Sequence, residues 1–158
     1  MTPQPCSEPA EPTRSGRILA IDPGEKRIGV AAADLRTRVA VPVTTIDAGA
    51  DPVEAVTQLA REQGAQALVV GLALTLSGAL GPQAQRAQAL ADALAGRLDI
   101  PVHTWDERLT SAEARRRLPR PGRRASVRKR RPKGDLDAVA AAIILQAYLD
   151  SQRGAASE

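Results

Sequence analysis

The sequence contains very little aromatic, imidazole or sulfur chemistry. Phenylalanine is absent, and Trp105, Tyr148, His103 and Cys6 are each the only residue of their kind. Proteins that bind single-stranded nucleic acid by stacking bases on successive aromatic rings are therefore a poor match. A single cysteine excludes a disulfide or a cysteine-ligated metal within the chain. The core must be built from Val, Ile, Leu and Ala.

Long apolar runs are also missing. No segment approaches the roughly 18 apolar residues of a membrane span, and the N-terminal stretch lacks the apolar centre of a signal peptide. We therefore expect a cytoplasmic protein with no membrane partner. The 158 residues suit one domain, which we place at residues 16–150. Residues 1–15, rich in Pro, Ser and Glu, and residues 151–158 are expected to be disordered tails.

Positive charge is concentrated in one segment. The net charge is +4, yet 11 Lys or Arg and no acid lie between Arg115 and Lys133, and the rest of the chain carries 11 bases and 18 acids. Such a block is typical of a segment that binds polyanions, and arginine suits phosphate geometry; a solvated charge run is the alternative. Because Gly, Pro and Arg dominate residues 119–133, we predict a mobile basic loop there.

A carboxylate lies at the centre of the most informative stretch, residues 17–34. Ile18–Ile21 and Ile28–Ala33 are predicted to be paired strands joined by a turn. Asp22 ends the first strand, where a charge without a partner is unfavourable. It either caps the turn or holds a cation. Gly29 interrupts the second strand, which indicates that another backbone or a ligand approaches there.

The remaining pattern alternates short apolar runs with helical periodicity and predicts an α/β domain. Its sheet is expected to have five strands, the first three antiparallel and the later ones parallel, with helices on both faces. Pro42 places the third strand at an edge or at a bulge. Further strands are predicted at 38–46, 67–72 and 100–105, and helices at 51–63, 82–98, 110–118 and 135–149. Ala140, Ile143, Ile144 and Ala147 are predicted to form the packed face of the last helix.

Acidic residues follow two of these strands and open the last helix. Sites in open α/β sheets form beyond the carboxyl ends of strands, where Asp22 and Glu107 lie, and Asp135 or Asp137 begins the final helix. Carboxylates without cysteine suit Mg²⁺ or Mn²⁺. Two such ions, about 3.5–4 Å apart, can activate water for phosphodiester cleavage. The alternatives are that Asp106 pairs with an arginine and that the helical acids only cap the helix.

Four motifs resemble those of the YqgF (RuvX) family and run in the family's order across residues 17–150. They are Ala20–Ala31, Val69–Leu72 followed by Gly78 and Gly81-Pro82, Asp106–Ala114, and Lys133–Ala141 with Ile144–Leu149. The resemblance implies a ribonuclease H-like fold related to Holliday-junction resolvases. It also implies a metal-dependent nuclease that processes the 5′ end of pre-16S ribosomal RNA or, alternatively, resolves Holliday junctions in DNA recombination.

The resemblance assigns roles residue by residue. Asp22, Glu107 and Asp137 match the family's catalytic and metal-binding acids, with two ions expected and Asp135 as an additional acid. The second motif departs from the family, because Ala73 stands where proline is usual and Thr75 where asparagine is usual. This departure leaves the three acids unchanged.

Nucleic-acid contacts are assigned from charge and position, and the partner is expected to be structured RNA such as pre-rRNA, or branched DNA. A junction resolvase needs two sites and hence a homodimer. Two other classes remain open: an ATP-binding protein of the actin or sugar-kinase type, which normally needs two such domains, and a non-catalytic nucleic-acid-binding module. The predicted contacts are Lys26, Arg27, Arg108, Arg123, Arg124, Arg128, Lys129, Arg130 and Arg131.

Overall fold

The computed structural model describes residues 16–49, 51–75, 77–110 and 133–156. All five predicted strands are present. In chain order the elements are β1 (Arg17–Pro23), β2 (Arg27–Asp34), β3 (Ala40–Asp47), α1 (Pro52–Glu62), β4 (Ala65–Leu72), α2 (Pro82–Arg97), β5 (Val102–Asp106), the 3₁₀ helix η1 (Glu107–Leu109) and α5 (Lys133–Ala156).

The strands form one mixed sheet in the order β3-β2-β1-β4-β5. β2 pairs antiparallel with both β1 and β3, while β4 pairs parallel with β1 and β5. This arrangement confirms the predicted fold class. β3 lies at an edge, and its register with β2 shifts between Val30 and Ala31, where Ala31 pairs with Pro42. Both features indicated by Pro42 are therefore present.

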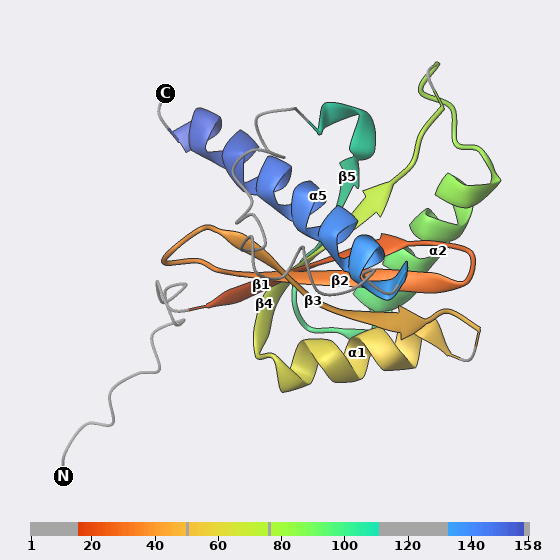
Figure 1. Cartoon of the computed structure of the whole chain (residues 1–158), viewed down its shortest axis with the longest axis horizontal. Coiled ribbons are helices and arrows are strands. Elements are labelled where there is room, and N and C mark those ends of the chain that lie inside the picture. The colour runs from red at the N-terminus through yellow and green to blue at the C-terminus, as the bar shows by residue number, and fades with distance from the viewer. Residues whose placement is uncertain (1–15, 50, 76, 111–132, 157–158) are drawn as a thin grey trace, which may run out of the picture.

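Helices cover both faces of the sheet, with α1 and α2 on one face and α5 on the other (Figure 1). Alternate residues of β1 pack into the two layers. Leu19 and Ile21 join the cluster beneath α1 and α2, whereas Ile18 and Ala20 join the cluster beneath α5. Because side chains alternate along a strand, Asp22 belongs to the α5 face.

The helices α1 and α2 follow their sequence signals. The Asp51 side chain accepts a hydrogen bond from the Glu54 backbone N–H at 3.1 Å, and Gly64 adopts the positive φ of 63° that favours glycine after a helix. The apolar face predicted for α2 is buried. Its members are Ala84, Ala87, Leu90, Ala91, Leu94 and Leu98.

The helix α5 differs from its prediction at both ends. Its predicted packed face is confirmed in part, since Ile144 and Ala147 are buried. The helix begins at Lys133, which was assigned to the loop, and continues to Ala156, so residues 151–156 are helical rather than a tail. No proline follows Leu149 to stop the helix. Ala140 and Ile143 are only half-buried. The fully buried positions include Ala138, Ala141, Ala142, Leu145 and Leu149.

A buried amide fixes α5 against the edge of the sheet. Gln146, 4% exposed, accepts a hydrogen bond from the Ala40 N–H at 3.0 Å and donates to the Arg38 carbonyl at 3.2 Å. These bonds tie the helix to the start of β3. They also supply partners for polar groups that would otherwise be buried without one.

Several predictions fall outside the described residues: the tail at 1–15, most of the helix at 110–118, and the loop up to residue 132. Within the part of the chain that the structure does describe, no helix has the length and hydropathy needed to cross a lipid bilayer.

Candidate functional site

Asp22 ends the central strand β1 and is half-buried. The following turn is closed by its own backbone, since the Gly24 N–H donates to the Arg27 carbonyl at 2.9 Å. The turn therefore does not depend on the Asp22 carboxylate as a cap. This observation favours the second alternative, in which the carboxylate is used for binding.

Glu107 reaches the site from the end of β5. It opens η1, whose cap is the Asp106 side chain accepting from the Arg108 N–H at 2.9 Å. The neighbouring strand leaves room for it at Gly71: a Cβ there would lie 3.0 Å from Glu107 Oε1 and 2.7 Å from Ile144 Cδ1. The missing side chain at Gly71 thus lets Glu107 lie over β4, the strand next to β1.

Asp137 reaches the site from the first turns of α5. Gly29 pairs directly with Asp22 across β1 and β2, and a Cβ at Gly29 would lie 1.9 Å from the Asp137 carbonyl oxygen. The helix backbone therefore rests on the sheet at this point. The close approach that the sequence indicated at Gly29 is made by α5, and it brings Asp137 beside Asp22.

Asp22 interacts with both of the other acids. The pKa of Asp22 is raised from 3.8 to about 8, first by burial, then by a hydrogen bond and charge repulsion from Glu107, and then by the charge of Asp137. Without a cation, Asp22 therefore holds a proton at neutral pH. Asp22 and Glu107 line a cavity of about 160 Å³ together with Thr110 and the apolar residues Ala140, Ile143 and Ile144 of α5.

The donor chemistry fits a hard divalent cation. Three carboxylates supply the oxygen ligands that Mg²⁺ and Mn²⁺ prefer. The raised pKa of Asp22 shows that positive charge, whether a proton or a metal ion, is favourable at this carboxylate. Among the described residues, no three His, Cys, Asp or Glu side chains are already gathered as a ligand set. Asp137 acts on Asp22 through its charge, while Glu107 also makes a hydrogen bond. The Asp135 side chain lies outside the described part.

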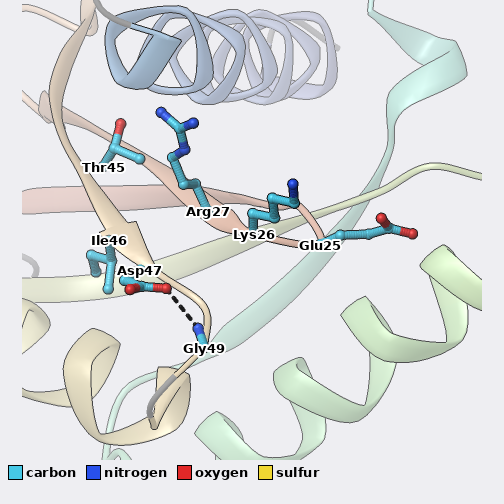
Figure 2. A pocket seen from close by; sticks show the side chains of 7 residues that line it. All are labelled: Glu25, Lys26, Arg27, Thr45, Ile46, Asp47 and Gly49. Carbon is cyan, nitrogen blue, oxygen red and sulfur yellow. Dashed lines mark hydrogen bonds between the residues drawn. The ribbon is translucent and has the colours of Figure 1, made fainter.

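Two of the predicted basic contacts lie on the β1–β2 hairpin beside Asp22. Lys26 and Arg27 line an open hollow of about 690 Å³ that Thr45 and Asp47 also line. Figure 2 shows both basic side chains extending on the side of α5, whereas Glu25 turns toward α2, where it pairs with Arg86 at 3.7 Å. Lys26 and Arg27 are thus on the same face of the sheet as the acids.

Arg108 is engaged within the protein. Its guanidinium donates to both Asp106 carboxylate oxygens at 2.7–3.1 Å and to the Thr75 carbonyl at 3.5 Å. The pairing of Asp106 with an arginine is therefore present. Arg108 also connects η1 to the loop after β4, in which Thr75 lies. The other predicted contacts, from Arg123 to Arg131, fall outside the described residues.

Sequence reasoning missed two contributors to the site, Gly71 and Thr110. Gly71 interrupts an apolar strand in the same way as Gly29, so the same signal was available. Thr110 was predicted only as the start of the helix at 110–118, because nothing in its local pattern distinguishes a helix cap from a residue that lines a cavity.

The sheet order and the helix lying across β1 and β2 define a ribonuclease H-like fold, with acids at the ends of two of its strands. The fold matches that of Thermus thermophilus RuvC, solved in complex with a Holliday junction substrate, with a TM-score of 0.53 and 16% identity over 88% of this chain and 96% of that chain.

The family model described as "RuvX: Holliday junction resolvase" matches residues 16–151. A Chloroflexus aggregans protein is 48% identical over 139 residues, covering 86% of this chain and 94% of the relative. A Roseiflexus protein is 44% identical over 140 residues, covering 87% and 96%. Both are named "Putative pre-16S rRNA nuclease". The chain belongs to the RuvX family and is a hydrolase acting on ester bonds.

Gly29→Ala is predicted to destabilise the fold by about 1–3 kcal/mol or more, because the new methyl group overlaps the α5 backbone. It should also impair nuclease activity by displacing Asp137. Gly96→Ala is the matched control: a Cβ there meets nothing within 4 Å, so the change should be neutral or stabilising by up to about 1 kcal/mol. Urea unfolding measures both, and equal stabilities would contradict the proposed contact.

The metal-free protein is predicted to lose stability as pH rises from about 4 to about 8. The folded pKa of Asp22, about 8, exceeds the unfolded value of 3.8, so the folded state binds the extra proton in this window. The contribution is fully present below pH 4 and is lost through pH 8. Asp22→Asn should flatten this dependence in thermal melts, and an unchanged slope would show that Asp22 is not the titrating group.

Proposed function

We propose that Asp22, Glu107 and Asp137 hold two Mg²⁺ or Mn²⁺ ions and that the protein hydrolyses phosphodiester bonds of structured RNA in the cytoplasm. The biological substrate that we infer is the 5′ region of pre-16S ribosomal RNA. The observation that carries this proposal is the pKa of Asp22, raised to about 8 by burial and by the two neighbouring acids. Such crowding is unfavourable unless positive charge compensates it.

Each acid has a distinct role in the proposal. Asp22, from the middle strand of the sheet, would be the central ligand of the ions, and Glu107 and Asp137 would hold them from either side. Bound divalent ions supply an activated water and a counter-charge for the leaving oxygen. Binding displaces the proton that Asp22 holds at neutral pH, so metal affinity should increase with pH. Lys26 and Arg27 then contact substrate phosphates beside the acids.

The names of the sequence relatives support RNA as the substrate, since the Chloroflexus and Roseiflexus proteins are named for pre-16S rRNA. A second candidate is resolution of branched DNA. It is favoured by the family model's description and by the fold shared with RuvC, which was solved with a Holliday junction. That activity requires paired incisions and therefore a homodimer.

Asp22→Asn, Glu107→Gln and Asp137→Asn are each predicted to lower Mn²⁺-dependent cleavage by at least about 100-fold, as expected for loss of a catalytic group. Asp92→Asn, at an exposed position on α2, is the matched control and should leave cleavage unchanged. The assay compares an RNA carrying a 5′ extension of 16S rRNA with a four-way DNA junction. Cleavage of the RNA alone supports the proposal, whereas cleavage of the junction alone supports the second candidate.

Cleavage of neither substrate by the wild-type protein, across both metals, would contradict the nuclease proposal. Nucleic-acid binding that persists in that case would favour the non-catalytic module. Light scattering on the same samples reports whether a dimer forms, which only the junction activity requires.

Replacing the basic residues from Arg123 to Arg131 with glutamine is predicted to weaken RNA binding and to flatten its salt dependence. Each lost phosphate contact should reduce the slope of log K against log salt by about 0.7–0.9. Arg36→Gln with Arg61→Gln, both exposed and outside the proposed contacts, is the control for loss of positive charge elsewhere on the surface. Fluorescence anisotropy from low to high salt measures both, and equal slopes would exclude this segment from the interface. The residues replaced are Arg123, Arg124, Arg128, Lys129, Arg130 and Arg131.

A further inference from the structure

The Thr110 hydroxyl is a buried polar atom without a hydrogen-bond partner. Buried hydroxyl groups normally have one, and an exception in a native fold calls for an explanation. Among the described residues, the only other such atoms are Arg38 Nε and Trp105 Nε1. Neither of those residues lines the acidic cavity, whereas Thr110 does.

Among the described residues, Thr110 is the only polar one lining this cavity besides the acids Asp22 and Glu107, and the others are Ala140, Ile143 and Ile144. The cavity volume is about 160 Å³, which exceeds the roughly 30 Å³ that one water occupies in the liquid. A water here has the polar partners that a buried water requires: two carboxyl groups and one hydroxyl. The apolar wall offers no competing partner.

The backbone fixes Thr110 relative to Glu107. The Thr110 N–H donates to the Glu107 carbonyl at 3.1 Å, and Thr110 is the residue at which η1 ends. The other end of η1 is held by Asp106, which caps it and is itself held by the Arg108 guanidinium. The position of Thr110 relative to Glu107 is therefore fixed by η1, a single helical turn that is held at both ends.

We propose that Thr110 is a positioning residue that orients a water molecule between Asp22 and Glu107. Its hydroxyl donates a hydrogen bond to the oxygen of that water, and the water donates its own protons to the carboxylate oxygens of Asp22 and Glu107. A hydroxyl is required because carboxylates accept only, whereas threonine both donates and accepts. This inference depends on the proposed metal site, since the water is of the kind that a bound Mg²⁺ or Mn²⁺ retains as a ligand.

The experiment compares Thr110→Val, which keeps the shape and removes the hydroxyl, with Thr110→Ser, which keeps the hydroxyl. Three quantities are measured: kcat and KM for RNA cleavage, Mn²⁺ affinity by electron paramagnetic resonance, and the water-proton relaxation enhancement of the Mn²⁺-loaded protein without substrate. The relaxation measurement reports bound water independently of activity. Thermal melts show that each variant is folded, and Thr110→Ala replaces the valine variant if that one is unstable.

The expected result is a fall in kcat of about 10–100-fold for Thr110→Val with KM unchanged. The relaxation enhancement should change, and Thr110→Ser should restore both. A valine variant with wild-type kcat and relaxation overturns the inference, as does a serine variant as impaired as the valine variant, because a purely structural role predicts that pattern.

Asp22→Asn in the same assays separates this inference from the proposed function. If Asp22→Asn loses Mn²⁺ binding and cleavage while Thr110→Val behaves as wild type, only the role of Thr110 is refuted. If Asp22→Asn retains both, the proposed metal site is itself refuted, and the inference about Thr110 falls with it.

Discussion

The burial of Asp22 beside two acidic neighbours is the constraint on which the rest of the structure depends. The sheet places Asp22 at the end of its central strand, and the raised pKa of about 8 records how unfavourable a negative charge is there. A fold that held these groups together only for stability would gain from replacing them with apolar residues of similar volume. The arrangement is better explained by the binding of positive charge.

The chain holds these acids together by removing side chains at two points. Gly29 lets the backbone of α5 rest on β2, and Gly71 lets Glu107 lie over β4. The helix is then tied at its other half by Gln146, which bonds to the backbone around the start of β3. Elements that are distant in sequence are thereby fixed relative to one another, by a backbone contact at Gly29 and by side-chain contacts at Gly71 and Gln146.

The strands and the helices α1 and α2 were predictable because their signals are local. Apolar runs bounded by Gly and Pro marked the strands, and Asp51-Pro52 marked the start of α1. The face of α5 was only partly predictable from periodicity, because alanine and isoleucine occur nearly all round this helix. Ile143 lies at the cavity rather than in the core. The side of α5 that packs on the sheet depends on the close approach of the helix backbone to Gly29, which is a tertiary contact.

The pairing of Arg108 with Asp106 has a consequence for substrate binding. Arg108 holds the pKa of Asp106 below its usual value, so this ion pair adds no net positive charge beside Glu107. Among the described residues predicted to contact a polyanionic substrate, only Lys26 and Arg27 then provide unpaired positive charge near the acids. Cations held by the acids would reverse the sign of the field at the cavity. Metal binding and substrate binding are then expected to be mutually favourable, since each supplies the charge that the other lacks.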